Sequence, residues 1–474
     1  MGVKGLLQRL RNAGITRSVR LSNGMLTYLD ADVSENYTDI TNPSYSIEDD
    51  PVHARTPPVE ETDNCNSRAN TLNARGRRTG DDRSKLRIGV DASMWIASVC
   101  YGMSEMLVDE RFLTPYSRAQ MEQKQLSVEE QRIKLEEQYT LKCSQSVVDM
   151  VLKLRDKCGV PSNHILVVLD GATPPAKQPK CDTRRKRKED ATAIYNGDHN
   201  DPALRIRASK MAGAPAHLLS KIKSIIIHEL LCHAIPYMVA PYESDSQLMY
   251  LSKMGYIDLV LSTDSDMIAM CVPALLCQLD LETGQGQLIR RRDLSSLCDD
   301  NFHLQSFTDT MMALLCVAAG CDYCENLPSV GIIRACQVVR AVFGQTDRGA
   351  ASGAAAQQQQ QQSTLRQMFD SLYQISSSTT TAFSDEYKET YERNFIEALC
   401  MYLHPVVFDP IDEKCIFVRH PITNPDKILL VSSTYYSELC RDHTLEKIQH
   451  IVGRLQSQQL AKKIASGWID PKEK

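Results

Sequence analysis

Three short apolar segments of this 474-residue chain each end in an aspartate. A helical stretch connects each segment to the next, and continuous apolar runs alternating with helices are typical of parallel strands that are buried on both faces. The pattern therefore predicts an α/β fold with a central, mostly parallel sheet flanked by helices. The three segments are residues 86–90 before Asp91, 165–169 before Asp170, and 257–263 before Asp264.

The stretch from Ala240 to Met267 adds further carboxylates to this pattern. Glu243 and Asp245 precede an apolar helical run, and Asp264 and Asp266 follow the third strand. Each pair is spaced i, i+2, which places both side chains on one side of an extended backbone. Taken alone, the stretch is equally consistent with an acidic helix cap and a solvated strand end.

The three strand ends favour a binding site over that alternative. In open α/β sheets, ligands bind beyond the carboxyl ends of the strands, so these side chains should meet in one crevice. Carboxylates this dense repel one another unless a cation lies among them, and all-oxygen ligation favours Mg²⁺ or Mn²⁺ over zinc. A pair of such ions is a common device for phosphodiester hydrolysis. The candidate ligands are Asp91, Asp170, Glu243, Asp245, Asp264, Asp266 and Asp322.

Composition and missing motifs exclude several other classes of protein. The sequence contains no G-x-x-x-x-G-K-[ST] loop and no G-x-S-x-G motif, which argues against P-loop nucleotide hydrolysis and serine hydrolysis. Sixteen cysteines are scattered without framework spacing, as expected for reduced thiols, and the single pair Cys321 and Cys324 is not expected to hold zinc. With no membrane-spanning run or signal peptide, we expect a soluble nuclear or cytosolic protein.

A strongly basic cluster follows Asp170. It holds seven Lys or Arg residues between Lys177 and Lys188, although the net charge of the whole chain is −5. By itself the cluster is equally consistent with a nuclear localisation signal, a solvated helix face or a phosphate-binding surface. Its position directly after a candidate ligand favours the phosphate-binding surface.

The rest of the chain divides by composition. Residues 25–85, 104–140, about 196–215 and 345–382 are rich in polar residues or low in complexity, and we interpret them as insertions. Residues 25–85 and 345–382 are predicted to be disordered, and 383–474 to form a helical extension. The core is then 1–24 together with 86–300.

Six blocks in order resemble the flap endonuclease and exonuclease 1 family of structure-specific 5′ nucleases, whose fold is the XPG-type, PIN-like 5′ nuclease fold. Several blocks are most similar to the exonuclease 1 branch. The resemblance implies a helical arch at about 171–231 and a helix-turn-helix DNA anchor at 301–344. The blocks are MGVKGLLQ, VDASMW, LDGATPPAK with RRKRK, APYESDSQLMYL, STDSDMIA and GCDYCENLPSVG.

The resemblance also implies roles for residues. The seven carboxylates would be ligands of two Mg²⁺ ions, with Mn²⁺ as a substitute, and Asp170 would be catalytic. In the arch, Lys177 and Arg185 are the predicted catalytic phosphate contacts, and Arg184 and Lys188 would also bind DNA. Gly2 would lie at the active site and contact phosphate, although simple packing at a helix start explains it equally well.

The predicted DNA anchor departs from the family pattern. Ser329 stands where the family usually has a glycine, and Arg334 replaces the usual lysine, whereas Gly331 is retained. All three are predicted to bind DNA, and the turn is a candidate K⁺ site. Residues 362–369 approximate a sliding-clamp binding sequence, although it lacks the second aromatic residue.

By this resemblance, we expect a monomeric, nuclear, Mg²⁺-dependent 5′-to-3′ exonuclease on nicked, gapped or flapped duplex DNA, with 5′ flap endonuclease activity. Mismatch-repair proteins and a sliding clamp are the expected protein partners, and no long partner-binding tail is expected after Lys474. The alternatives are a dedicated flap endonuclease, a catalytically silent DNA-binding scaffold, and, less favoured, a small-molecule Mg²⁺ phosphatase.

Overall fold

A computed structural model gives the structure of the chain. It describes residues 3, 5–29, 85–107, 128–196, 210, 214–299, 301–344, 364–377, 383–424, 426–441 and 445–468. None of the helices in these ranges is long and apolar enough to cross a membrane.

An eight-stranded sheet forms the centre of the molecule, in the order β2-β1-β8-β7-β6-β3-β4-β5. The five strands from β7 to β5 are parallel, whereas β8, β1 and β2 pair antiparallel at one side. The mostly parallel sheet predicted from the sequence is therefore confirmed. The strands are β1 Arg17–Ser22, β2 Met25–Tyr28, β3 Ile88–Asp91, β4 Ile165–Leu169, β5 Tyr237–Val239, β6 Leu259–Leu261, β7 Ala274–Cys277 and β8 Gln285–Arg290.

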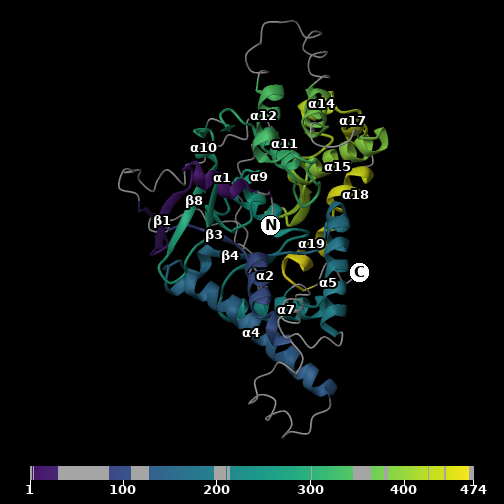
Figure 1. Cartoon of the computed structure of the whole chain (residues 1–474). Coiled ribbons are helices and arrows are strands. Elements are labelled where there is room, and N and C mark those ends of the chain that lie inside the picture. Colours follow the sequence, from purple (N-terminus) through teal and green to yellow (C-terminus); the bar gives the residue numbers. More distant parts are fainter. Residues whose placement is uncertain are drawn as a thin grey trace.

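Helices cover both faces of this sheet, which is why its central strands are apolar throughout. In β4, Ile165, Val167 and Leu169 pack on one face and Leu166 and Val168 on the other. Figure 1 shows α2, α4 and α7 on one side of the strands and α1, α9 and α11 on the other. The bounds are α2 Ala92–Gly102, α4 Val128–Asp156 and α7 Ala216–Cys232 on the first face, and α1 Leu6–Asn12, α8 Ser244–Lys253, α9 Asp266–Ala269 and α11 Asp309–Ala319 on the second.

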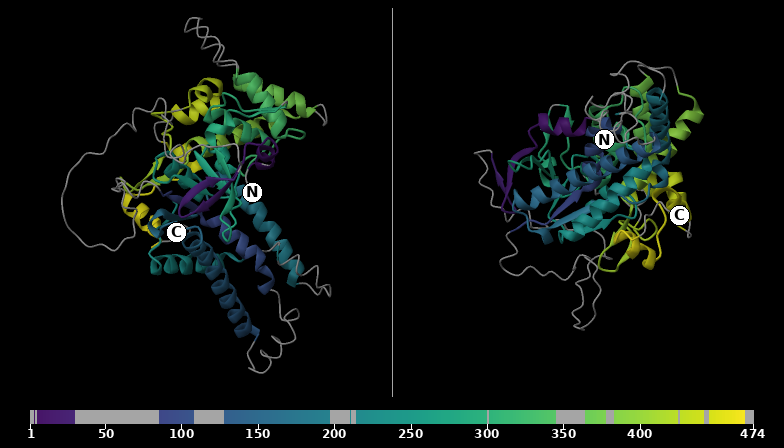
Figure 2. Two further views of the ribbon diagram at one scale, coloured as in Figure 1. Left: turned by 90° about the vertical axis from the view of Figure 1, so that its left-hand side faces the viewer. Right: turned by 90° about the horizontal axis from the view of Figure 1, so that it is seen from below.

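Two helices project from this body. The long helix α4 and the basic helix α5 (Gln178–Asn196) extend from the same side of the molecule, as Figure 2 shows. A single 3-10 turn, η6 (Pro175–Lys177), joins the end of β4 to α5. The predicted arch thus begins as a helix directly beyond Asp170. Other short elements are η3 Ser104–Leu107, η5 Ser162–His164, α10 Arg291–Leu294 and the pair β9 Cys298–Asp299 and β10 Phe302–His303.

The predicted boundaries of the N-terminal insertions need correction. Residues 25–28 form β2, which pairs with β1 and buries Leu26, so the ordered core continues past residue 24. Residues 128–156 form one continuous helix, in which Tyr139 and Cys143 are buried, so the predicted insertion at 104–140 does not extend to residue 140. Residues 30–84 and 108–127 lie outside the described ranges.

The C-terminal third is mostly helical and packs mainly on the second face of the sheet, while Ile464 of α19 packs on the first. Its elements are α12 Ile332–Phe343, α14 Thr364–Ser377, α15 Asp385–Leu403, the hairpin β11 Val406–Asp409 and β12 Lys414–Phe417, α16 Lys427–Ser432, α17 Thr434–Arg441, α18 Glu446–Val452 and α19 Gln458–Ala465. The predicted helical extension at 383–474 is therefore present in its described parts.

Helix α14 corrects the prediction of a disordered linker over 345–382. Leu365, Met368 and Phe369 are buried against the core, because the apolar residues of this segment recur at helical spacing. These residues are the apolar positions of the predicted clamp-binding sequence. Because they pack inside the protein, that interpretation of the sequence is wrong for this structure.

Candidate active site

Asp91 and Asp170 end two neighbouring parallel strands. Asp91 also caps α2, where its Oδ1 accepts a hydrogen bond of 3.3 Å from the backbone N–H of Met94. The hydroxyl of Ser244 lies 3.1 Å from Asp91 Oδ1 and 2.8 Å from Asp170 Oδ1. One serine at the start of α8 therefore joins two strand ends that are 79 residues apart in sequence.

The start of α8 is held against the end of β4 by backbone contacts. The N–H of Gly171 donates to the carbonyl of Tyr242 over 2.6 Å, and that of Ala172 donates to Pro241 over 3.1 Å. A Cβ atom at residue 171 would overlap the carbonyl oxygen of Ala240, so only glycine permits this approach. Glu243 caps α8 in an extended conformation and Asp245 lies in its first turn, which brings both to the ends of the strands.

Asp245, Asp264 and Asp266 form the centre of the cluster. Each offers a carboxylate oxygen, and these oxygens lie within 4.8 Å of one another. The N–H of Asp266 donates to Asp264 Oδ1 over 3.1 Å, and Ser262 Oγ accepts from the N–H of Asp264 over 3.0 Å. Ser262 also donates to Asp91 Oδ2 over 2.9 Å, so this group is continuous with the strand ends.

The electrostatics of the cluster fit a hard cation. Burial and the neighbouring charge of Asp170 raise the pKa of Asp91 to about 7. Burial and Asp264 likewise raise the pKa of Asp266 to about 7, and burial together with Asp91 raises that of Asp245 well above its usual range. Carboxylates that resist ionisation because they are buried and face one another are stabilised by a cation that accepts oxygen ligands, such as Mg²⁺.

Two basic side chains from the arch reach the outer carboxylates. The Lys177 ammonium contacts Glu243 Oε1 and lies 3.6 Å from Asp322 Oδ2. Arg184 Nη2 lies 2.9 Å from both oxygens of Asp322. Burial alone would raise the pKa of Asp322, but these two cations hold it below its usual range. All seven predicted ligands therefore lie in one site, with arch cations at its outer side.

Arg185 does not reach this site. It is exposed and pairs with Asp182 and Glu189 on its own helix. Arg184 lies seven residues after Lys177, about two helical turns, whereas Arg185 is rotated by a further ~100° around the axis. The structure thus places Lys177 and Arg184, but not Arg185, beside the candidate ligands, and the role of Lys177 and Arg185 as phosphate contacts stays a prediction. Lys188 is exposed further along α5, and Gly2 lies outside the described residues.

The helix-turn-helix is present between α11 and α12, with an unexpected turn residue. Ser329 has φ 63°, the left-handed conformation that favours glycine, while Gly331 is extended at φ −102° and ψ −177°. The residue with the unusual conformation is therefore Ser329 and not the retained glycine, Gly331. Arg334 donates to the carbonyl of Ser329 over 2.8 Å, so these residues do lie together.

The sequence analysis missed several residues that lie at the site. For Ser244, the available signal was its position between Glu243 and Asp245. Lys223, whose ammonium donates to the Asp170 carbonyl over 2.8 Å, is one of two lysines on α7, and no motif distinguishes it. The hydroxyls of Tyr323 and Tyr402, discussed below, contact Glu243 and Asp266.

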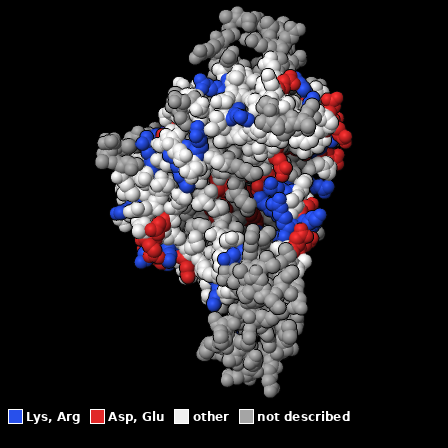
Figure 3. All heavy atoms as spheres, in the orientation of Figure 1, with Lys and Arg blue, Asp and Glu red and all other residues white. Residues whose placement is uncertain are grey.

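Figure 3 shows the site as a hollow in the surface, with acidic atoms at its base and basic side chains beside it. The basic atoms to the right of the hollow lie over α5, as comparison with Figure 1 shows. An acidic base for cations beside a basic wall for phosphates is suited to a phosphodiester substrate.

Comparison with known proteins agrees with this geometry. Residues 234–322, which contain five of the seven carboxylates, match the model of the XPG I-region. Exonuclease 1 from Xenopus laevis is 25% identical over 262 residues, which are 53% of this chain and 30% of that protein. The chain is therefore similar to the XPG family over this region. Other similar proteins are the DNA damage-inducible protein DIN7 of Saccharomyces cerevisiae, 30% identical over 37% of this chain and 40% of that protein, and flap endonuclease 1 of Kluyveromyces lactis, 27% identical over 36% of this chain and 43% of that protein.

The matched regions cover only part of each protein. The chain spans between about a third and two fifths of the length of the first relatives it matches. Among solved structures, the catalytic core of Rad2 in complex with DNA substrate aligns over 77% of this chain and 91% of that one, at 16% identity and a TM-score of 0.38.

Proposed function

We propose that the protein is a Mg²⁺-dependent 5′-to-3′ exonuclease on double-stranded DNA that also cleaves 5′ flaps. The observation that carries this proposal is the meeting of seven carboxylates with Lys177 and Arg184. The carboxylates are suited to hold the ions of two-metal phosphodiester hydrolysis, and the two basic side chains are suited to bind the phosphate. The relatives named exonuclease 1 and flap endonuclease 1 support the same chemistry.

Two Mg²⁺ ions would be held by the seven carboxylates, with the close group of Asp245, Asp264 and Asp266 among them. When bound, the ions would supply a nucleophile from water and neutralise charge on the leaving oxygen. The raised pKa values of Asp91 and Asp266 support an ion at this position, since a divalent cation stabilises their charged forms.

The arch cations would hold the scissile phosphate. Lys177 and Arg184 pair with the outer ligands Glu243 and Asp322. A phosphate group that approaches the cluster could take the place of these carboxylates as the partner of the two basic side chains. A guanidinium and an ammonium together fix the position of a phosphate and balance its charge. Because such contacts are electrostatic, DNA binding should weaken steeply as salt is raised.

The helix-turn-helix would bind the duplex part of the DNA. Ser329, Gly331 and Arg334 would then lie next to the DNA phosphate backbone. The carbonyl of Ser329 already accepts a hydrogen bond from Arg334, and this contact disfavours K⁺ binding at the turn. Nicked, gapped and flapped duplexes are the proposed substrates, and a nuclear location, a monomeric state and an association with mismatch-repair proteins and a sliding clamp complete the proposal. The clamp would have to bind somewhere other than the buried face of α14.

Substitution of one ligand from each part of the site tests the proposal. We expect Asp170→Ala and Asp264→Ala each to reduce cleavage of an end-labelled nicked duplex by about 100-fold or more in Mg²⁺. DNA binding, measured in Ca²⁺ by fluorescence anisotropy, should remain within a few fold of wild type. Asp156→Ala, which removes an exposed carboxylate from α4, is the control and should cleave normally. Retained cleavage by both site variants would overturn the two-metal assignment.

A dedicated flap endonuclease is the second candidate, because flap endonuclease 1 matches the same region of the chain. Rates on a nicked duplex and on a 5′ flap at equal Mg²⁺ separate the two. An exonuclease releases successive short products from the nicked duplex, whereas a dedicated flap endonuclease cuts the flap alone.

A further inference from the structure

We propose that Tyr402 and Tyr323 are positioning residues that orient the metal ligands Asp266 and Glu243. This inference rests on the proposed function, because it concerns how the carboxylates are presented to the ions. It adds to the site a residue from the C-terminal helix α15, which is 136 residues from Asp266 in sequence.

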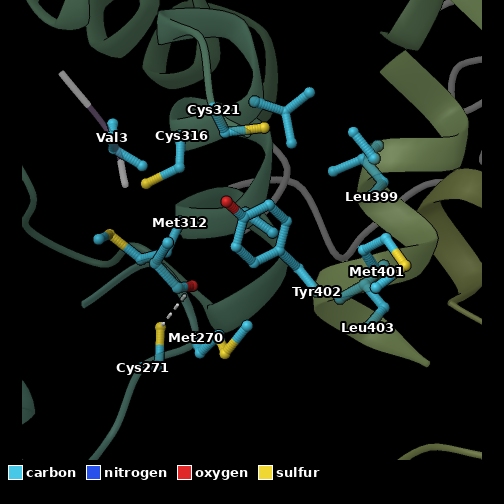
Figure 4. Packing of buried hydrophobic residues seen from close by; sticks show 14 of the residues in the cluster. Val3, Met270, Cys271, Met312, Cys316, Cys321, Leu399, Met401, Tyr402 and Leu403 are labelled. Atoms are coloured by element: carbon cyan, nitrogen blue, oxygen red, sulfur yellow. Dashed lines mark hydrogen bonds between the residues drawn. The ribbon is translucent and has the colours of Figure 1, made fainter. Parts of the chain in front are cut away.

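Tyr402 reaches the cluster from the end of α15. Its hydroxyl donates to Asp266 Oδ1 over 3.1 Å, and only 5% of the residue is exposed. Figure 4 shows its ring extending from α15 toward Met312 and Cys316 of α11. Because these neighbours fix the ring, the hydroxyl holds one oxygen of Asp266 in a defined direction and leaves Oδ2 for another partner.

Tyr323 does the same for Glu243. Its hydroxyl donates to Glu243 Oε2, while Lys177 contacts the other oxygen of the same carboxylate. The Lys177 ammonium also lies 5.8 Å from the centre of the Tyr323 ring. This tyrosine therefore contacts both a ligand and the arch cation beside it.

The two rings pack on one another. Their centres are 5.7 Å apart and their planes cross at 88°, an edge-to-face arrangement that is favourable for aromatic pairs. The pair connects α15 to the segment after α11 and fixes the two hydroxyls relative to each other. Hydrogen bonds that orient a metal-ligating side chain typically change metal affinity by 10–100-fold when they are removed.

The same helix offers a matched control. Tyr391 is also on α15 and is also buried, but within the described part of the chain its hydroxyl has no hydrogen-bond partner. Tyr391→Phe and Tyr402→Phe therefore remove the same atom from the same helix, and only the second removes a bond to a ligand.

The affinity of the full chain for Mn²⁺ tests the inference without relying on activity. It is measured by titration, with the EPR signal reporting the concentration of free Mn²⁺. We expect Tyr402→Phe to bind Mn²⁺ about 10-fold or more weakly than wild type, and Tyr391→Phe to bind it equally. A purely structural role of Tyr402 would instead lower the melting temperature equally in EDTA and in Mn²⁺, with no change in affinity. Circular dichroism establishes that each variant is folded.

Tyr323→Phe provides a second, independent variant and should weaken Mn²⁺ binding in the same way. Folded Tyr402→Phe and Tyr323→Phe proteins that bind Mn²⁺ as wild type does would overturn the inference and leave the proposed nuclease intact. A wild-type protein that binds no Mn²⁺ would overturn the proposed function as well as this inference. If Tyr402→Phe does not fold, the result for Tyr323→Phe decides.

Discussion

At the scale of single residues, the site is a balance of charges. Lys177 and Arg184 neutralise the outer carboxylates Glu243 and Asp322, whereas the inner ones face each other. The pKa of Asp322 is accordingly lowered, while those of Asp91 and Asp266 are raised to about 7. The inner carboxylates are therefore where a bound cation changes the stability of the protein most.

This balance predicts how stability depends on pH. Between an unfolded pKa near 4 and a folded value of about 7, the folded chain binds more protons at Asp91 and Asp266 than the unfolded chain. These groups therefore make the free energy of unfolding fall as pH rises through that window. In EDTA, the melting temperature should show this fall between pH 5 and pH 8. Because protons compete with metal, Mg²⁺ should raise the melting temperature more at pH 8 than at pH 5.

Asp266→Asn isolates this contribution, since the amide resembles the protonated carboxyl. Its melting temperature in EDTA should fall less from pH 5 to pH 8 than that of wild type. The comparison is needed because burial lowers the pKa of His404 to about 4, so His404 lowers stability as pH falls below 6.5. Identical pH profiles for wild type and Asp266→Asn would contradict the assignment.

At the scale of elements, the turn between α11 and α12 illustrates a local conflict between sequence and conformation. Ser329 adopts a left-handed conformation at φ 63°, and two residues later a glycine adopts an ordinary extended one. The cost of that conformation for a residue with a Cβ atom is about 1 kcal/mol, and glycine avoids it. The short connection and the hydrogen bond from Arg334 maintain the turn despite this cost.

We therefore expect Ser329→Gly to stabilise the protein, by up to about 1 kcal/mol in the free energy of unfolding from urea titration. Gly331→Ala is the matched control: an added Cβ meets no atom within 4 Å, so stability should stay within about 0.5 kcal/mol of wild type. A marked loss of stability in Gly331→Ala together with none gained in Ser329→Gly would show that the turn is built differently.

At the scale of the whole molecule, the C-terminal helices are part of the hydrophobic core around the central sheet. Phe395 and Leu399 of α15 are fully buried in the same cluster as Met267 and Met312, which lie beside the site. Tyr402 of the same helix bonds to Asp266. The segment after residue 382 thus contributes to both the core and the candidate metal centre.

A chain that ends at residue 382 should consequently lose cooperative folding. We expect a broad, weak thermal transition by circular dichroism, rapid proteolysis and no Mn²⁺ binding, because the removed helices leave large apolar surfaces exposed. The full chain measured in parallel is the control. A truncated chain that melts sharply and binds Mn²⁺ would show that the extension is dispensable.

The sequence by itself determined the sheet and the carboxylate set. Uninterrupted apolar strands, each followed by an acidic residue, obey a general rule of parallel sheets, so Asp91, Asp170 and Asp264 were placed correctly without coordinates. These features are local, or follow from topology that any such sheet shares, and sequence patterns are sufficient for them. Asp266 joins these aspartates, but not through the extended backbone that the i, i+2 spacing predicted, because Ser265 is helical and Asp266 begins α9.

Only the tertiary structure decided which cations and hydroxyls complete the site. Arg184 rather than Arg185 faces Asp322 because of the phase of α5 relative to the sheet, and no pattern within RRKRK distinguishes the two. Tyr402 reaches Asp266 across 136 residues because α15 packs against α11, a contact between distant apolar surfaces that composition does not encode. Long-range packing, which has no fixed spacing in sequence, therefore set the final geometry around the carboxylates.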